Sequence, residues 1–510
     1  MLGTRAIQME GITKCFGSVV ANDHISLDLY RGEILSLLGE NGSGKTTLMN
    51  MLAGIYFPDD GVICINGRPV VIRSPHDALN LGIGMIHQHF KLVDVLTAAE
   101  NIILGIPGSM KLDMKTVNRK VAEISEKYGF ALDPKKKIYD MSVSEKQTVE
   151  IVKMLYRGAD FLILDEPTAV LTPQETRKLF DVLRNMRADG KSVIIITHKL
   201  AEVMEISDRV SVLRRGKYIG SFHTSETNPQ QLTEMMVGGA VTLNIDRTDP
   251  KNREERLRIQ DLTCVNHEGV ALLNKVSFTI YSGEILGIAG IAGSGQKELL
   301  ESIAGLQSAR GSILYSDPKT GKQEELIGCS PQKISQMGIA LSFVPEDRLG
   351  MGLVGVMDII DNIMLRKYQQ NKGFFADRRP SKQMAENIVE QLSVATPDLF
   401  TEIRRLSGGN VQKVLLGREI SLEPTVLMSA YAVRGLDIHT SYMIYRLMNE
   451  QKEKGTAVIY VGEDLDVLLQ LCDRILVMCG GQLSGIVDAR TTTKEEVGML
   501  MMQVGGGKTE

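Results

Sequence analysis

Short, continuous apolar runs alternate with longer segments of mixed polarity along the first half of the chain. Such runs occur at residues 34–38, 83–86, 161–164 and 192–197, and the segments between them are helical in pattern, as at 47–53 and from about 97 to 139. Runs of this length are typical of strands buried on both faces of a sheet. The pattern therefore predicts a mostly parallel α/β sheet. Residues 7–29, where apolar and polar positions alternate, predict strands of a separate β-rich region.

The same features occur twice. Gly32 and Gly283 each open a Gly-Glu-Ile-Leu segment, 251 positions apart, whereas Asp208 and Asp473 lie in matching Asp-Arg segments 265 positions apart. A long-period repeat indicates two homologous domains, and the change of offset places about 14 extra residues in the second. We expect a first domain at 1–243, a polar linker without apolar periodicity at 244–256, and a second domain at 257–510.

A glycine-rich loop follows the first buried run and leads into a helical segment. It reads Gly-Glu-Asn-Gly-Ser-Gly-Lys-Thr over residues 39–46, in the context typical of a phosphate-binding P-loop. The alternative, an ordinary turn between strand and helix, does not require the Lys-Thr pair. Backbone N–H groups would surround the phosphates, Lys45 would add positive charge, and the Thr46 hydroxyl would ligate Mg²⁺. The predicted nucleotide-binding residues here are Gly39, Asn41, Gly42, Ser43, Gly44, Lys45, Thr46 and Thr47.

Composition narrows the function classes. The formal net charge of −4 argues against a nucleic-acid binder. No apolar run approaches the roughly 18–20 residues of a membrane span, and the N-terminus has no signal-peptide pattern, so we expect a cytosolic protein. The six cysteines include no C-x-x-C pair and indicate neither a zinc site nor a redox motif.

Polar residues at the ends of the buried strands come in a characteristic order. After the P-loop come Gln88, then Ser142 at a helix start, then Asp165-Glu166-Pro-Thr after a strand, and His198 after the next strand. A single strand-end Gln or His is more often structural. The ordered set resembles the nucleotide-binding domain of ABC (ATP-binding cassette) ATPases, twice over nearly the whole chain. The resemblance implies an α/β fold of two tandem P-loop NTPase domains, each with a RecA-like parallel-sheet core, an antiparallel β subdomain and a helical subdomain.

The resemblance also implies roles for these residues, with ATP and Mg²⁺ as ligands. Glu166 would orient or deprotonate the attacking water, His198 would hydrogen-bond the γ-phosphate, and Gln88 would contact Mg²⁺ or water and sense a membrane partner. Phe16 would stack on adenine, although an aromatic residue in a strand more often belongs to the core. The implied metal ligands are Thr46, Gln88 and Asp165.

The second half departs from this pattern at its catalytic positions. Gln296 replaces Lys45, which removes a charge-assisted phosphate contact worth about 1.5–3 kcal/mol. The degenerate second site comprises Gly290, Gly293, Gly295, Gln296, Ala430, Tyr431 and Glu463. We expect this half not to hydrolyse ATP on its own P-loop.

The signature motif shows the opposite distribution. Ser407, Gly408 and Gly409 are close to the family pattern, whereas in the first half Val143 and Ser144 place side chains where glycines let the backbone approach phosphate. In ABC proteins each nucleotide lies between the P-loop of one domain and the signature of the other. The resemblance thus implies one competent and one degenerate composite site, formed by head-to-tail pairing of the domains. Random loss of motif residues would have affected both composite sites, but all of the departures from the family pattern fall in one of them.

The second P-loop, together with the segments 344–348, 406–410 and 434–437, resembles the ATPase subunits of simple-sugar and nucleoside importers, and the segment 86–93 favours the nucleoside branch. This implies ATP hydrolysis coupled to transport, two integral membrane permeases, an extracellular solute-binding lipoprotein, and a place at the cytoplasmic face of the membrane. The same role in a ribose, galactose or xylose importer is the alternative. A soluble tandem cassette of the translation-factor type would have two intact P-loops and a basic linker, and a pure scaffold would not need the complete catalytic set.

Overall fold

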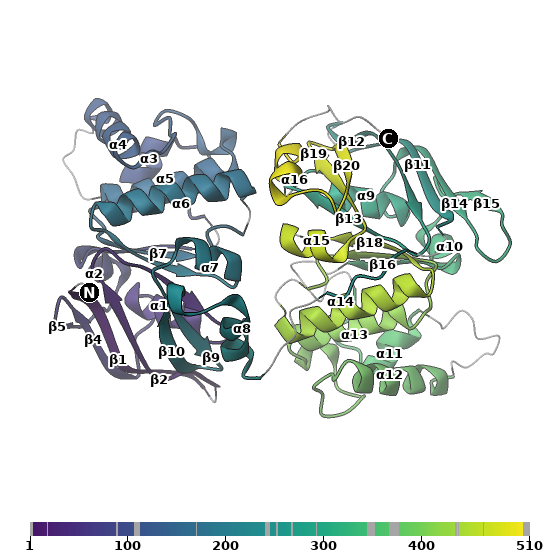
Figure 1. Ribbon diagram of the computed structural model, residues 1–510, viewed down its shortest axis with the longest axis horizontal. Coiled ribbons are helices and arrows are strands. Elements are labelled where there is room, and N and C mark those ends of the chain that lie inside the picture. Colours follow the sequence, from purple (N-terminus) through teal and green to yellow (C-terminus); the bar gives the residue numbers. More distant parts are fainter. Residues whose placement is uncertain are drawn as a thin grey trace. The chain divides into compact units, whose positions relative to one another are not determined.

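The protein is described by a computed structural model that divides into two units, Met1–Thr242 and Leu243–Glu510. Within its described residues, each unit has one four-stranded sheet and one six-stranded sheet; Figure 1 shows these sheets with their helices. The described residues are 4–17, 19–87, 90–106, 113–169, 171–239, 245–250, 253–266, 269–291, 293–343, 352–366, 377–433, 436, 438–462 and 464–502.

The first unit follows the predicted order of elements. Its strands are β1 (Arg5–Phe16), β2 (Val19–Tyr30), β3 (Ile34–Leu38), β4 (Asp60–Ile65), β5 (Arg68–Val70), β6 (Ile83–Ile86), β7 (Phe161–Asp165), β8 (Ser192–Ile196), β9 (Arg209–Arg214) and β10 (Lys217–His223). Its helices are α1 (Lys45–Leu52), α2 (Pro75–Asn80), α3 (Ala98–Ile103), α4 (Met114–Tyr128), α5 (Val143–Tyr156), α6 (Pro173–Ala188), α7 (Leu200–Ile206) and α8 (Pro229–Val237).

The six-stranded sheet of this unit brings the predicted site residues to one edge. Its order is β10-β9-β3-β8-β7-β6, and all neighbours pair in parallel except β10 with β9. All five residues of β3 are buried, as a central strand covered on both faces requires. Ile34 pairs with Val193 and Asp165 with Ile196, so the glycine-rich loop, Asp165 and the turn after β8 all follow the carboxyl ends of adjacent strands.

The second unit repeats this architecture. Its strands are β11 (Glu255–Val265), β12 (Ala271–Tyr281), β13 (Ile285–Gly290), β14 (Arg310–Ser316), β15 (Gln323–Glu325), β16 (Ile339–Phe343), β17 (Val426–Ala430), β18 (Ala457–Val461), β19 (Arg474–Cys479) and β20 (Gln482–Asp488). Its helices are α9 (Gln296–Ile303), α10 (Pro331–Gln336), α11 (Ile359–Met364), α12 (Arg379–Gln391), α13 (Gly408–Ile420), α14 (Ile438–Glu453), α15 (Leu465–Leu471) and α16 (Lys494–Leu500). Its larger sheet has the order β16-β17-β18-β13-β19-β20.

The extra residues of the second unit are spread over several connections rather than inserted once. Part of the extra length lies between β14 and β15, which Figure 1 shows as an extended hairpin. Further residues lie between β16 and α11 and between α11 and α12. These connections leave the strands of the larger sheet and the helices that follow them in the same order as in the first unit.

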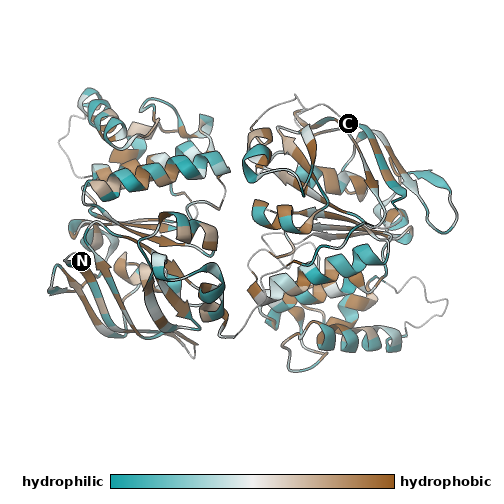
Figure 2. Ribbon diagram, viewed as in Figure 1, coloured by the Kyte–Doolittle hydropathy of each residue, from teal (hydrophilic) through white to brown (hydrophobic). Residues whose placement is uncertain are grey.

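Apolar residues fill the space between the sheets and their helices. One cluster of the first unit joins the small sheet, α1 and one face of the large sheet, and a second lies on the opposite face against α6. A separate cluster joins α3, α4 and α5, so these helices form the helical subdomain. Figure 2 shows the strands of the large sheets as mainly hydrophobic. Within the part of the chain that the structure describes, no helix is long and apolar enough to cross a membrane.

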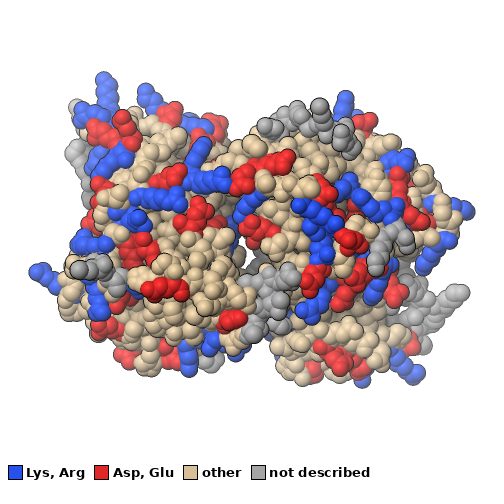
Figure 3. All heavy atoms as spheres, in the orientation of Figure 1, with Lys and Arg blue, Asp and Glu red and all other residues tan. Residues whose placement is uncertain are grey.

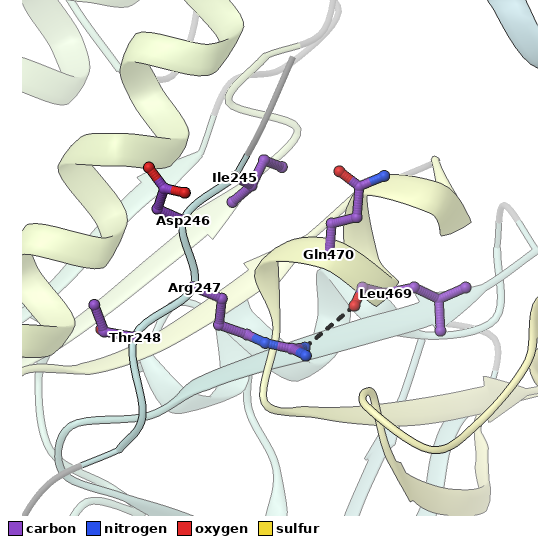
Figure 4. Close-up of a pocket in the computed structure, with 6 residues that line it drawn as sticks. All are labelled: Ile245, Asp246, Arg247, Thr248, Leu469 and Gln470. Carbon is purple, nitrogen blue, oxygen red and sulfur yellow. Dashed lines mark hydrogen bonds between the residues drawn. The ribbon is translucent and has the colours of Figure 1, made fainter. Parts of the chain in front are cut away.

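The segment predicted as a polar linker is partly structured against the second unit. Its last residues belong to β11, which starts at Glu255, and Ile245 is buried in the core beside α15. Arg247 Nη1 donates to Leu469 O at the end of α15 (Figure 4). It also donates to Cys472 O, directly after that helix. We call residues 245–250 the strap; with Leu469 and Gln470 it borders an open surface pocket of about 500 Å³ that shares no residue with the predicted nucleotide sites.

Candidate nucleotide-binding and catalytic site

The glycine-rich loop of the first unit leaves the start of α1 open. Gly44 precedes the helix at φ 94°, where an L side chain is strained, and no side chain caps the helix. A Cβ at Gly39 would lie 2.4 Å from Leu213 O, so the loop lies close against the strand behind it. The first N–H groups of a helix have no partner within the helix. This loop therefore offers backbone donors and a favourable dipole to an anion.

Lys45 is held inside this loop by backbone carbonyls. Its Nζ donates to Gly39 O at 2.7 Å and to Glu40 O at 2.9 Å, and the side chain is buried. Burial lowers the pKa of Lys45, although the carboxylates of Glu166, Asp165 and Glu40 oppose the shift. Ser43 Oγ is buried without a hydrogen-bond partner within the described ranges. A buried ammonium and an unsatisfied hydroxyl in one loop fit a phosphate ligand.

Thr46 and Asp165 fit a magnesium ion. Thr46 Oγ1 lies 3.4 Å from Asp165 Oδ2, although the two residues are on different elements. Burial, followed by the neighbouring charge of Glu166, raises the pKa of Asp165 to about 6, which a divalent cation would reverse. The described residues contain no group of three or more His, Cys, Asp or Glu side chains able to hold a metal. Oxygen ligands from one hydroxyl and one carboxylate suit Mg²⁺, which usually completes its coordination with phosphate and water.

Glu166 and His198 form a direct pair beside Asp165. His198 Nδ1 lies 2.8 Å from Glu166 Oε1, and Glu166 N donates to Ile196 O at 2.9 Å. Burial alone would raise the pKa of Glu166, but the His198 hydrogen bond and the charges of His198, Lys45 and Lys199 hold that pKa below its usual value. For His198, burial favours the neutral ring, yet the contact with Glu166 raises the imidazole pKa. The geometry keeps the carboxylate ionised and available as a base.

Phe16 lies at the end of β1 and is exposed. The ring is 44% exposed and meets Tyr56 edge-on, with ring centroids 5.2 Å apart, while Lys14 Nζ lies 5.6 Å from the Phe16 centroid. An aromatic ring that belonged to the core would be buried. The exposure of Phe16 therefore favours the stacking role over the core alternative.

The two signature helices differ in how their N-termini are capped. In α5, Ser142 Oγ accepts from Glu145 N and Glu145 Oε2 accepts from Ser142 N, a reciprocal capping box. In α13, Ser407 makes no side-chain bond to the helix backbone, and its hydroxyl accepts instead from Asn410 Nδ2. The N-terminus of α13 is open to an anion, whereas that of α5 is satisfied internally and carries a carboxylate.

Glu145 is the residue that the sequence analysis missed. Ser-x-x-Glu at a helix start is a recognisable capping signal, and it would have identified the carboxylate. The Glu145 carboxylate is also paired with Lys136, whose Nζ lies 2.6 Å from Glu145 Oε1. The departure of the first signature from the family pattern is thus electrostatic as well as steric.

The second glycine-rich loop has the same backbone with different chemistry. Gly295 precedes α9 at φ 98°, and Gly293 is also left-handed. Gln296 is buried and its Nε2 donates to Ile291 O, as Lys45 does to its own loop but without the charge. Gly290 is closely approached, because a Cβ there would lie 2.4 Å from Gln296 Nε2. Lys297 is half exposed and pairs with Glu301 on the same helix.

The carboxylate positions of the second unit are filled by residues that pack. Ala430 is buried at the end of β17, and Tyr431 lies partly buried against the same core. Gln88 and Glu463 lie outside the described residues, as do Arg434, Gly435 and Asp437 of the loop after Tyr431. The structure thus brings Lys45, Thr46, Asp165, Glu166 and His198 together in the first unit and places no ionisable pair at Ala430 and Tyr431 in the second.

The fold and the site define a tandem ATP-binding cassette. The family model described as "ABC transporter" matches residues 22–169 and 273–429, and the chain belongs to this family. It is 42% identical, over 100% of both chains, to a nucleoside import ATP-binding protein of Lactococcus lactis. It is also 42% identical to a guanosine import ATP-binding protein of Bacillus subtilis, over 97% of each chain. A ribose import ATP-binding protein of Rubrobacter xylanophilus is 39% identical over 96% of this chain and 97% of its own.

Proposed function

We propose that this chain is the energy-coupling ATPase subunit of a nucleoside importer, with one competent and one degenerate ATP site. The observation that carries the proposal is the Glu166–His198 pair beside the P-loop lysine Lys45 in the first unit. In the second unit the carboxylates of Asp165 and Glu166 are replaced by Ala430 and Tyr431. Relatives that are 42% identical over almost the full length and are named for nucleoside and guanosine import support the solute class.

In the proposed reaction ATP lies with its phosphates against the open end of α1 and Lys45, and with its adenine on Phe16. Glu166 accepts a proton from water as the water oxygen attacks the γ-phosphorus, and the bond to the β-phosphate oxygen breaks to give ADP and phosphate. A general base of this kind contributes about 10²–10⁴ in rate. His198 orients Glu166 and donates toward the γ-phosphate. Bound Mg²⁺, held by Thr46 and Asp165 with Gln88, would neutralise charge on the phosphate oxygens.

The competent site is proposed to be completed by the signature of the second unit. The open N-terminus of α13, with Ser407, Gly408 and Gly409, offers donors to the γ-phosphate when the two units pair head to tail. The capped N-terminus of α5 offers a satisfied Ser142 and the Glu145 carboxylate to the degenerate site. The difference in capping supports the assignment of the competent and degenerate sites.

Two permease subunits are the proposed partners, at the cytoplasmic face of the membrane. Each unit exposes three apolar residues at corresponding positions around the start of its helical subdomain, namely Val93, Val95 and Leu104, and Val354, Val356 and Leu365. The loops have the same internal support, because Val93 N donates to Asn101 Oδ1 and Val354 N to Asn362 Oδ1. We assign this duplicated apolar surface to the two permeases, which would also connect the chain to an extracellular solute-binding lipoprotein.

Nucleic acid is not among the proposed partners. The net charge is −4, and on the face that Figure 3 shows, basic and acidic side chains are interspersed rather than gathered by sign. A nucleic-acid surface would require a concentrated basic region.

The test is ATP hydrolysis by the full chain assembled with its permeases, comparing wild type, Glu166→Gln and Tyr431→Phe. We expect Glu166→Gln to reduce kcat by at least about 10²-fold and Tyr431→Phe to leave kcat within twofold. A comparable loss in both variants would mean that the second unit contributes to the chemistry. Stimulation of hydrolysis by the binding protein loaded with guanosine, but not with ribose, supports the nucleoside assignment. Stimulation with ribose but not with guanosine supports the simple-sugar importer, the alternative that the ribose-import relative favours.

A further inference from the structure

The loop after Glu166 is fixed by polar side chains from the turn after β8. Lys199 Nζ donates to Thr168 O at 3.0 Å, and Thr168 Oγ1 donates to Glu202 Oε2 at 2.6 Å. Lys199 and Glu202 form an ion pair at 3.2 Å, and the Thr168 side chain is buried. We call Thr168, Lys199 and Glu202 the polar clamp. Every member bonds to both of the others.

The clamp joins the two segments that carry the catalytic pair. Thr168 lies two residues after Glu166, and Lys199 lies directly after His198. Glu166 itself has a positive φ of 47°, a conformation that the surrounding structure must impose on a residue with a side chain. Movement of either segment would change the 2.8 Å contact between Glu166 and His198.

The second unit forms the same turn without the clamp. The residues corresponding to Thr168, Lys199 and Glu202 are Val433, Asp464 and Val467. The two valines pack against an apolar cluster, and Asp464 accepts from Asp466 N as the cap of α15. Tyr431 nevertheless keeps φ 54° and donates from its N to Val461 O at 2.9 Å. Folding of this turn therefore does not require the clamp, which is present only in the unit with the catalytic pair.

We propose that Thr168, Lys199 and Glu202 are positioning residues for ATP hydrolysis, which hold the loop after Glu166 and the turn after His198 in register so that the carboxylate–imidazole pair meets the attacking water. This inference rests on the proposed function of the first unit. Small displacements of a catalytic group can cost up to about 10²-fold in rate, so fixing the position of this pair affects the rate of hydrolysis.

The second unit supplies the test variant. The double change Thr168→Val and Glu202→Val installs the residues that the second unit uses at the same positions, so the turn retains apolar packing while its polar contacts are lost. Using the full chain assembled with its permeases, we expect kcat for ATP hydrolysis to fall about tenfold with KM for ATP within twofold. Thr168→Ser, which keeps the hydroxyl donor, should retain kcat within twofold.

Lys191→Met is the matched control. Lys191 Nζ contacts Ala159 O at 3.1 Å and Asp160 Oδ1 at 2.6 Å, and thus clamps the same two strands, β7 and β8, at the opposite edge of the sheet. Its kcat should stay within twofold of wild type. Wild-type kcat in the double variant would overturn the inference, and so would an equal fall of kcat in Lys191→Met. A fall in activity that came from a raised KM for ATP, with kcat unchanged, would also overturn it. Glu166→Gln in the same assay separates the two proposals. If Glu166→Gln hydrolyses ATP at the wild-type rate, the proposed function is wrong. If Glu166→Gln is inactive but the double variant is normal, only the clamp inference is wrong.

Discussion

Glu166 in the first unit and Tyr431 in the second have nearly the same backbone but opposite chemical capacity. Each has a positive φ, 47° and 54°, and each donates its N–H at 2.9 Å to the last residue of the neighbouring strand. The turn is thus fixed by the pairing of strands and not by the Glu166 carboxylate. Divergence of the two units has changed side chains at the edge of the sheet while its backbone stayed the same, so exchanges between the units are informative experiments.

The largest expected effect on stability concerns an ion pair that occurs at corresponding positions in both units. Lys452 and Asp473 lie 2.8 Å apart, almost fully buried, and Lys452 Nζ also donates to Thr248 O of the strap. Their counterparts Arg187 and Asp208, 2.6 Å apart, are about 40% exposed. Lys452→Met removes one partner of a buried pair and should destabilise the second unit by about 3 kcal/mol, because Asp473 stays buried.

Arg187→Met is the control for this prediction, with an expected loss below about 1 kcal/mol. Urea unfolding followed by circular dichroism measures both, since the chain has no tryptophan. If both variants lost the same free energy of unfolding, the buried Lys452–Asp473 pair and its contact with the strap would contribute no more than the exposed Arg187–Asp208 pair.

Lys45→Gln gives the first unit the loop residue of the second. The amide can still reach a carbonyl of its own loop, as Gln296 reaches Ile291 O, so the fold should be retained. Loss of a charged phosphate contact of about 1.5–3 kcal/mol lowers kcat/KM for ATP by roughly 10- to 150-fold. Lys297→Ala, at an exposed lysine of α9, should leave kcat/KM unchanged. Activity retained in Lys45→Gln would mean that the two loops are functionally equivalent.

Asp165→Asn should stabilise the protein while it removes a proposed metal ligand. The folded-state pKa of Asp165 is raised to about 6 from a usual 3.8, so between about pH 4 and 6 the folded protein holds a proton there that the unfolded chain releases. Ionised Asp165 therefore costs stability above pH 6, by about 3 kcal/mol, and this cost disappears as the pH falls below about 4. The second unit already avoids the cost with Ala430.

We expect the melting temperature of nucleotide-free Asp165→Asn to exceed that of wild type at pH 7.5, and the difference to shrink toward pH 5. A difference that grows on acidification would contradict the assigned pKa shift. Addition of ATP and Mg²⁺ should narrow the difference at pH 7.5, because only wild type retains the carboxylate.

The order of elements and the residues at the carboxyl edge of the sheet could be predicted from sequence because they depend on local patterns. Fully buried strands such as β3 read as continuous apolar runs, and the glycines of the P-loop have a fixed spacing. The strap could not be predicted, because a polar segment without periodicity gives no sign that Arg247 will satisfy carbonyls at the end of α15. The polar clamp was also hidden, since Thr168 and Glu202 are 34 positions apart.

The smallest predicted effect concerns the signature helices and makes the second resemble the first. Asn410 occupies the position of Glu145, and Asn410→Glu would let a carboxylate reach Ser407 N and close a capping box at the start of α13. An acidic residue in the first turn stabilises a helix by roughly 0.3–1 kcal/mol, so the fold should be slightly more stable. The same charge opposes an incoming phosphate, and with the lost backbone donor should reduce ATP hydrolysis about threefold to tenfold.

Asn410→Gln, which lengthens the side chain without adding charge, is the control and should hydrolyse ATP within twofold of wild type. Glu145→Gln in the first unit should likewise leave the rate unchanged, because that helix faces the degenerate site in the proposed arrangement. If Glu145→Gln changed hydrolysis while Asn410→Glu did not, the signature of the first unit would be the one that meets the reacting nucleotide. The assignment of the competent and degenerate sites would then have to be reversed.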